Sequence, residues 1–260
     1  LAPVIVIAKL IMQQVWMEKS DWDETLTPIS TINWTKFIQK CTSIADIAIP
    51  RWTKFNPKAK MEIHGFCDSS EYAYAACIHI RIDHSEHDID ISLLASKTRV
   101  APIMKISLAK LELCGAILLS ELSVAITPNL QIKHFTTQYW SDSAIVLAWL
   151  KKPPCSWNTF VGNRVTAILE NIGNANWSHI ASSSNPADLG SRGCSAEDLK
   201  YHNLWWKGPQ WMTLPKSQWP TPISIQNTNL ELKPIKVLTT TTFEDPLNRF
   251  SSPPRAYRVI

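Results

Sequence analysis

Glycine and long apolar runs are scarce in this sequence. Only 7 of its 260 residues are glycine, against 17 prolines, which excludes a collagen-like chain. With 45% hydrophobic and 18% charged residues, the composition is that of a folded globular protein rather than a disordered one. The apolar start, Leu1 to Leu10, is interrupted by Lys9 and is shorter than a membrane span, so we predict no membrane association. The first residue is not methionine, and we expect the chain to be cut from a longer protein.

Paired cysteine motifs are also lacking. The six cysteines are scattered without a C-x-x-C pair or the His/Cys spacing of a zinc site, so we predict neither a zinc site nor a disulfide framework. We expect a reducing compartment.

The net charge of +4 is mild and permits a nucleic-acid partner without requiring one. Two basic stretches are either nucleic-acid contacts or solvated faces: Arg51, Lys54, Lys58 and Lys60, then Lys97, Arg99, Lys105 and Lys110.

The hydrophobic pattern changes character near residue 60. Before it, two stretches of helical periodicity predict a small helical element, which the steps Ile49-Pro50 and Asn56-Pro57 bring to an end. After it, the pattern alternates between strands and helices. The predicted strands are 62–67, 72–82, 89–97, 136–141 and 177–180, and the predicted helices are 107–126, 143–150, 158–170 and one that opens at Asn185-Pro186. Residues 196–260 are rich first in Trp and Pro and later in Thr and Ser, and we expect a linker and tail there.

Two aspartates follow apolar strand ends in similar settings, in Phe66-Cys67-Asp68-Ser69-Ser70 and in Trp140-Ser141-Asp142-Ser143-Ala144. If the first and fourth strands are neighbours in the sheet, both aspartates emerge at the same edge. Aspartate followed by serine at a strand end is also ordinary turn chemistry. Asp188, in the first turn of its predicted helix, is stabilised there by the helix dipole. Each of these acids therefore also has a purely structural explanation.

The helix predicted at 107–126 carries one acid beside its apolar stripe. The residues of that stripe are Leu108, Leu111, Gly115, Leu118 and Leu122. Glu112 is the only charged residue between Lys110 and Glu121. A carboxylate in that position costs free energy unless a cation or hydrogen-bond donors meet it, and the alternative is that it points into solvent. Four acids from two strand ends and two helices form a set suited to hard divalent cations, which prefer oxygen ligands.

Several long motifs follow one another in a fixed order. They are Phe66 to Ser70, Ser96 to Pro102 (SKTRVAP), Leu111 to Cys114 (LELC), Tyr139 to Ser143 (YWSDS), Trp157 to Arg164 (WNTFVGNR) and Asn185 to Gly193 (NPADLGSRG). In these motifs the sequence resembles the ribonuclease H region of BEL/Pao-type retrotransposon polyproteins. The likeness covers most of residues 1 to 220. Two positions differ mildly from the family, which usually has arginine at Lys110 and alanine at Gly190.

The resemblance implies an α/β fold of the ribonuclease H-like type: a five-stranded mixed sheet flanked by helices, with a small helical N-terminal extension. By the same likeness, residues 1–60 are the connection that follows a reverse transcriptase, 61–195 the ribonuclease H-like domain, and 196–260 the linker and tail toward an integrase. Asp68, Glu112, Asp142 and Asp188 match the family's catalytic and metal-binding acids one by one.

The activity implied is hydrolysis of the RNA strand of RNA/DNA hybrids with two Mg²⁺ ions, or Mn²⁺ in their place. The expected partners are the hybrid and the reverse transcriptase and integrase regions of the same polyprotein. The expected location is the cytoplasm, inside a virus-like particle, with the nucleus as the alternative. Residues expected to contact nucleic acid are Ser69, Lys97, Arg99, Ser143, Asn163 and Arg164. Many cellular ribonucleases H carry a histidine on a loop before the last acid, but His179 falls in a predicted strand and receives no catalytic role.

Three other functions share some of these sequence features. A catalytically inactive, domesticated remnant would bind nucleic acid or protein without cutting, although all four acids are present. An aspartic protease needs a glycine after its Asp-Ser or Asp-Thr pair, whereas Ser70 and Ala144 occupy those places. An integrase core shares the broad fold but uses three acids, and the zinc-binding His/Cys segment that precedes it is missing.

Overall fold

The computed structural model describes residues 1–21, 23–50, 52–55, 59–85, 88–130, 132, 134–221 and 223–234. Arg51 and Lys58 of the first basic stretch, the Asn56-Pro57 step and residues 235–260 of the expected tail lie outside this described part. Within it, every helix is too short or too polar to traverse a lipid bilayer.

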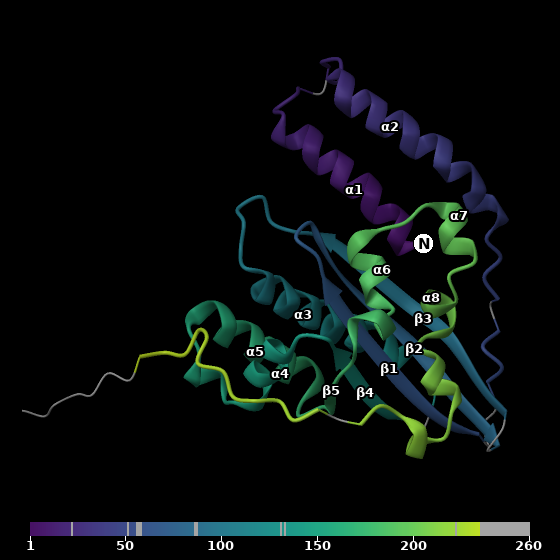
Figure 1. The fold of residues 1–260 in the computed structure, drawn as a ribbon, viewed down its shortest axis with the longest axis vertical. Helices are drawn as coiled ribbons and strands as arrows, with labels where there is room; N and C mark the ends of the chain where they lie inside the picture. Colours follow the sequence, from purple (N-terminus) through teal and green to yellow (C-terminus); the bar gives the residue numbers. More distant parts are fainter. Residues whose placement is uncertain are drawn as a thin grey trace, which may run out of the picture.

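A five-stranded mixed sheet forms the centre of the molecule (Figure 1), with the order β3-β2-β1-β4-β5. The strands are β1 (Lys60–Ser69), β2 (Ala73–Ser85), β3 (Asp88–Val100), β4 (Thr136–Ser141) and β5 (Trp177–His179). The first three pair antiparallel, as expected for strands joined by short turns. β4 lies parallel to β1, and β5 lies parallel to β4, after helical crossovers. The predicted strands and mixed sheet are thus confirmed.

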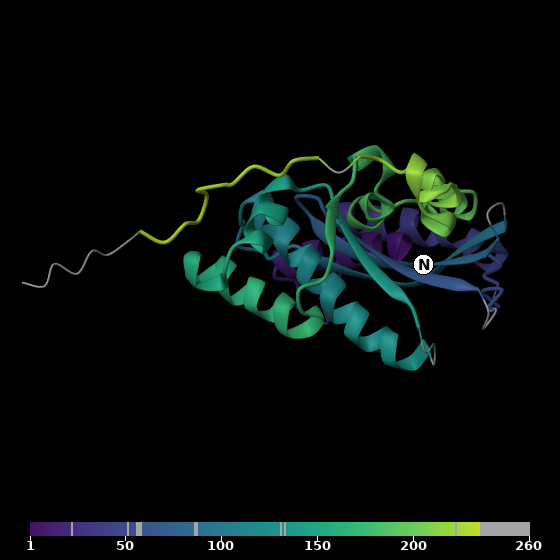
Figure 2. The ribbon, with the colours of Figure 1, turned by 90° about the horizontal axis from the view of Figure 1, so that it is seen from below.

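One face of the sheet is covered by the long helices. These are α3 (Leu108–Ile126), α4 (Ala144–Lys151) and α5 (Thr159–Ile172), and Figure 2 shows this layer on one side of the sheet. The core between them and the sheet includes Ile63, Ile78 and Leu118, together with the fully buried Trp149 and Trp157. α4 begins at Ser143, whose hydroxyl accepts a hydrogen bond from the Val146 backbone N–H at 3.3 Å.

One residue of the predicted stripe on α3 is not buried. Leu108 is 51% exposed, whereas Leu111 and Leu118 are buried as expected. Leu108 lies in the first turn of the helix, where it lines an open cavity of about 370 Å³ with Tyr72 and Ile103 instead of contacting the sheet. The error arises because periodicity assigns a residue to a helix face but does not show where the opposing surface ends.

The other face of the sheet has a core of its own, covered by short helices from the C-terminal part of the chain. These are α6 (Ala187–Arg192), α7 (Ala196–Lys200), α8 (Asn203–Lys207) and the 3-10 helices η5 (Gln210–Thr213) and η6 (Lys216–Gln218). Trp205 and Met212 are fully buried against Phe66 and Trp140 of the sheet. Residues 196–219, expected as the start of a linker, are therefore packed structure, because their tryptophans cover the second apolar face of the sheet.

The N-terminal extension is helical, as predicted, and it is attached to the same second core. It contains α1 (Ala2–Met17), α2 (Pro28–Cys41) and the 3-10 helix η1 (Thr42–Asp46). α1 is tied to the end of β3, since Lys9 Nζ donates to the Thr98 carbonyl at 2.7 Å and Gln13 Nε2 donates to the Ala101 carbonyl at 2.7 Å. Three further 3-10 helices lie between the larger elements of the described chain: η2 (Thr127–Leu130), η3 (Pro154–Ser156) and η4 (Ser182–Ser184).

Candidate metal centre

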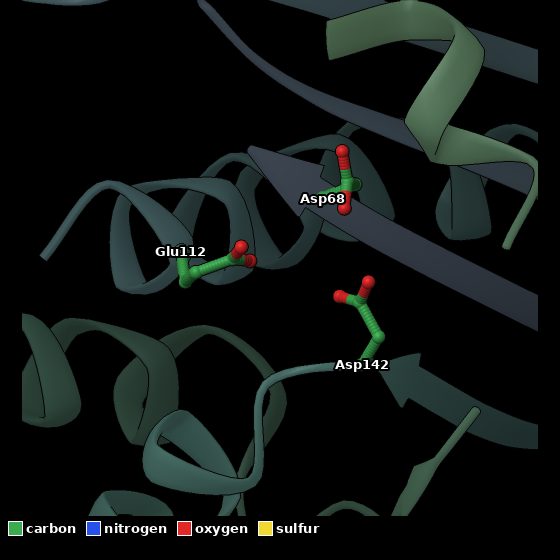
Figure 3. Close-up of side chains that lie close together, drawn as sticks. All are labelled: Asp68, Glu112 and Asp142. Carbon is green, nitrogen blue, oxygen red and sulfur yellow. The ribbon is translucent and has the colours of Figure 1, made fainter. Parts of the chain in front are cut away.

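Three of the four predicted acids converge at one edge of the sheet. Asp68 is the ninth residue of β1 and Asp142 directly follows β4. Because these strands run parallel, with Cys67 paired to Ser141, the two aspartates emerge at the same edge. Glu112 reaches the same space from the second turn of α3, and Figure 3 shows the three carboxylates pointing toward one another. One oxygen from each lies within 4.8 Å of the other two.

A close approach of α3 to the end of β1 sets the position of Glu112. A Cβ atom on Gly115, less than one turn further along α3, would lie 3.1 Å from the backbone carbonyl oxygen of Asp68. A side chain at this position would push the helix and the strand apart by a few tenths of an ångström, so the glycine favours this close packing. The spacing Glu112 to Gly115 therefore places the glutamate beside the aspartate on the neighbouring element.

Two serine hydroxyls orient the aspartates. Ser191 of α6 donates a hydrogen bond to Asp68 Oδ2. Ser182 of η4 donates to Asp142 Oδ2 at 2.6 Å. Neither serine was singled out by the sequence, although Ser191 belongs to the motif Asn185 to Gly193 and lies three residues after Asp188, on the same side of a helix.

The electrostatics of the pocket favour a cation. Burial, together with the charges of Asp142 and Asp188, raises the pKa of Asp68 to about 7, although the Ser191 hydrogen bond opposes the shift. Burial, followed by repulsion from Asp68 and Asp142, raises the pKa of Glu112 to about 9. Glu112 Oε2 and Asp142 Oδ1 are buried without a hydrogen-bond partner in the described chain. Buried carboxylate oxygens that repel one another and lack donors fit a divalent metal ion, which would satisfy all of them.

Asp188 lies beside this cluster but is not one of the three acids within 4.8 Å. It sits in the first turn of α6, and its Oδ1 pairs with Arg192 Nε at 2.6 Å. Its charge nevertheless contributes to the raised pKa of both Asp68 and Glu112. The structure therefore holds three of the predicted ligands together and the fourth within electrostatic reach, paired with a cation of its own helix.

The residues expected to contact nucleic acid fall into two settings. Ser69 and Ser143 directly follow Asp68 and Asp142, with Ser69 buried at the end of β1 and Ser143 capping α4. The other four lie on outer surfaces at more distant elements. Lys97 and Arg99 are on β3, where Arg99 pairs with Glu121 at 2.9 Å, and Asn163 and Arg164 are on α5.

Two further polar residues shape the edge of the sheet. His179 is in β5, as predicted, and its Nε2 is 3.1 Å from the Asp142 carbonyl oxygen, so it supports the backbone beside the cluster. Asn185 is buried, and its Nδ2 donates to the Cys67 carbonyl at 2.9 Å, which anchors the start of α6 against β1. The sequence placed Asn185 as a helix-capping residue but gave no sign of this contact to a strand 118 residues away.

The mixed sheet with helices on both faces, and the acids gathered where β1 and β4 end, define a ribonuclease H-like domain. The family described as "Pao retrotransposon-like RNaseH-like domain" matches residues 1–143, which include Asp68, Glu112 and Asp142. The chain belongs to this family.

Solved structures of similar fold share little sequence with the chain. The N-terminal ribonuclease H domain of a Mycobacterium tuberculosis protein is 13% identical, with a TM-score of 0.31, and the match covers 49% of this chain and 92% of that one. Ribonuclease H1 of the archaeon Halobacterium salinarum is 12% identical, with a TM-score of 0.31 and coverage of 49% and 90%. A foamy viral protease-reverse transcriptase in complex with double-stranded DNA is 8% identical, with a TM-score of 0.41 and coverage of 66% and 33%. No curated protein is similar enough to match.

Proposed function

We propose that the chain is a metal-dependent endonuclease that hydrolyses the RNA strand of RNA/DNA hybrids during reverse transcription of a retrotransposon. The observation that carries the proposal is the convergence of Asp68, Glu112 and Asp142, whose oxygens lie within 4.8 Å of one another. Membership of the retrotransposon family supports the biological setting. The proposal extends to the reverse transcriptase and integrase regions of one polyprotein as partners, and to a cytoplasmic virus-like particle, or the nucleus, as the location.

The four acids would share the work of holding Mg²⁺, with Mn²⁺ as a substitute. Asp68, Glu112 and Asp142 would hold one ion, and Asp68 together with Asp188, once Asp188 is released from Arg192, would hold a second. A pair of such ions supplies a nucleophile from water at neutral pH and stabilises the departing oxygen of a phosphodiester. The serines Ser182 and Ser191 keep two of the carboxylates oriented.

Recognition of the hybrid would depend on backbone charge and on the ribose 2′-hydroxyl rather than on base sequence, since the enzyme must accept any transcript. Ser69 and Ser143 directly follow Asp68 and Asp142. Ser143 would meet the sugar or the phosphate being cut, and Ser69, which is buried, would do so only after it is uncovered. Lys97, Arg99, Asn163 and Arg164 would bind phosphates further along the two strands.

The test is cleavage of an end-labelled RNA/DNA hybrid by the full chain in Mg²⁺ and, separately, in EDTA. We expect cleavage only with the metal, and a loss of about 100-fold or more in the Asp68→Asn and Asp142→Asn variants. Both variants remove one of several mutually repelling charges, so without metal their unfolding temperature should equal or exceed that of the wild type. Glu170→Gln, on an exposed surface of α5, is the control and should cleave normally.

A wild-type chain that binds the hybrid but does not cut it in either Mg²⁺ or Mn²⁺ would replace this proposal with the binding-module alternative. Unchanged cleavage by Asp142→Asn would show that the acidic cluster is not the active site.

A further inference from the structure

After η6 the chain does not leave the domain but runs along α4 and α5, and this segment, residues 225–233, is called the strap below (Figure 1, yellow). Its contacts are mostly between backbone groups or between a side chain and the backbone. Trp149 Nε1 donates to the Leu230 carbonyl at 3.0 Å, and the Lys233 N–H donates to the Ser156 carbonyl at 2.9 Å. The strap buries little apolar surface, since Leu230 is 48% and Leu232 is 36% exposed. It is therefore held by a few hydrogen bonds and can be displaced at low cost.

One residue of the strap makes the charged contact. Glu231 Oε1 lies 2.8 Å from Lys110 Nζ, and Glu231 Oε2 accepts a hydrogen bond from Asn158 Nδ2 at 3.2 Å. The backbone N–H of Asn158 donates to the Glu231 carbonyl at 2.8 Å. Glu231 has a φ of +64°, a left-handed conformation that non-glycine residues rarely adopt, so the contact is formed against a local backbone preference.

The groups that contact Glu231 all act as hydrogen-bond donors to it. Lys110 supplies an ammonium group, while Asn158 supplies an amide and the first N–H of the turn that opens α5. Asn158 stands at the N-cap of α5 but makes no side-chain cap bond, because its side chain is turned toward Glu231. Lys110 and Arg164 both approach the Phe160 ring, at 5.3 Å and 3.4 Å from its centre, which gathers positive charge around this position.

The site is on α3 and α5, the helices that also carry Glu112 and the candidate contact residues Asn163 and Arg164. Lys110 is in the first turn of α3, two residues before Glu112, and both candidate contact residues of α5 follow Asn158 within six positions. A carboxylate carries the same single negative charge as a phosphodiester and offers two oxygens in a similar arrangement. Lysine ammonium and helix N-terminal N–H groups are common partners of phosphate.

We infer that Lys110 and Asn158 form a binding site for one phosphodiester of the nucleic-acid backbone, and that Glu231 of the strap occupies this site until nucleic acid displaces it. The inference rests on the proposed function for the identity of the ligand. The strap is then an autoinhibitory element, because Glu231 must leave before a phosphodiester can contact Lys110 and Asn158.

The first experiment measures binding of a fluorescently labelled RNA/DNA hybrid to the full chain in EDTA, by anisotropy. Glu231→Gln keeps the size of the side chain and removes its charge, and we expect the hybrid to bind about fivefold more tightly. The matched control, Glu170→Gln on α5, removes an exposed charge that contacts neither Lys110 nor Asn158, and should change binding less than twofold. Lys110→Met should weaken binding little in the wild type but about fivefold or more in the Glu231→Gln background, because only there is Lys110 free.

The second experiment follows the strap itself. A glutamate-specific protease cuts after Glu231 only when that residue is released, so addition of the hybrid should accelerate this cut, identified by mass spectrometry. Equal effects of Lys110→Met in both backgrounds, or a cut at Glu231 that the hybrid does not accelerate, would overturn the inference. Neither experiment requires cleavage of the hybrid. A chain that shows both effects yet never cuts RNA would contradict the proposed function alone, and one that cuts RNA without either effect would contradict this inference alone.

Discussion

At the scale of single residues, the second face of the sheet carries buried polar groups whose partners come from distant parts of the chain. Glu62 has a side chain only 2% exposed and is paired with Lys216 at 2.7 Å and with Arg81 at 3.5 Å. Burial alone would raise the pKa of Glu62, but hydrogen bonds from His64 and Lys216 outweigh it and lower that pKa to about 2. Arg81 Nε in turn donates to the Met212 carbonyl at 2.8 Å. Loss of one partner would leave the other charge buried and uncompensated, so the stability of the second core depends on these ion pairs.

His79 gives this core a dependence on pH. It is fully buried, with Nε2 2.9 Å from the Trp205 carbonyl, and burial lowers its pKa to about 4. A histidine whose folded-state pKa lies below its unfolded value of about 6.5 stabilises the fold fully above pH 6.5 and loses that contribution as the pH falls toward 4. The loss for this residue is up to about 3 kcal/mol in the free energy of unfolding at pH 4.

His79→Gln keeps a donor for the Trp205 carbonyl but does not titrate. Chemical unfolding measured from pH 7 to pH 4 should therefore show a shallower loss of stability in this variant than in the wild type. Burial also lowers the pKa of His64, so part of the dependence should remain. An identical slope in the two proteins would show that His79 is not protonated on unfolding.

At the scale of elements, the position of α6 depends on a missing side chain. A Cβ atom on Gly190 would lie 2.7 Å from the Ala75 Cβ of β2, too close for either to stay in place. Gly190→Ala should therefore push α6 away from the sheet and lower the free energy of unfolding by about 1 to 3 kcal/mol, measured by denaturant titration. Because α6 holds Ser191 against Asp68, cleavage should also decrease.

The variant Ala75→Gly supplies the matched control. It removes the other atom of the clash, so the double variant should be more stable than the sum of the two single changes predicts. Strict additivity of the two changes would mean that the clash does not determine the position of α6.

The strands and helices could be predicted from the sequence, because periodicity and capping are local signals. Four acids were predicted to lie together, and three of them do so, because the connections between the strands determine the strand order. The polar side of β2 could not be interpreted in this way. Cys77, His79 and Arg81 alternate with apolar residues as if they faced solvent, yet all three are buried. Their covers, Trp205 and Met212, lie more than 120 residues away in sequence. Similarly, the sequence placed Asp188 with the other acids, whereas in the structure it pairs with Arg192, four residues further along the chain.

At the scale of the whole molecule, residues 196–219 close the second core and cannot be separated from the sheet as a linker. A chain that ends at residue 195 would expose the surfaces that Trp205 and Met212 cover. Loss of two large buried side chains costs several kcal/mol, so we expect the midpoint of thermal unfolding to fall by about 10 °C or more. A chain ending at residue 221 keeps Trp205 and Met212 and lacks only the strap and the residues that flank it, so it should lose much less. Equal midpoints for the two shortened chains would show that this segment contributes nothing to stability.

The late position of these covering residues also bears on how the protein is made. All four candidate metal ligands are synthesised before Trp205, Met212 and Lys216 emerge from the ribosome. Until then the nascent sheet has one uncovered face, and Glu62 lacks the lysine that compensates it. Translation therefore supplies the acids first and the residues that stabilise the surrounding fold last. If the chain is the nuclease proposed above, an unfinished or prematurely terminated chain should not cleave the RNA from which it is translated.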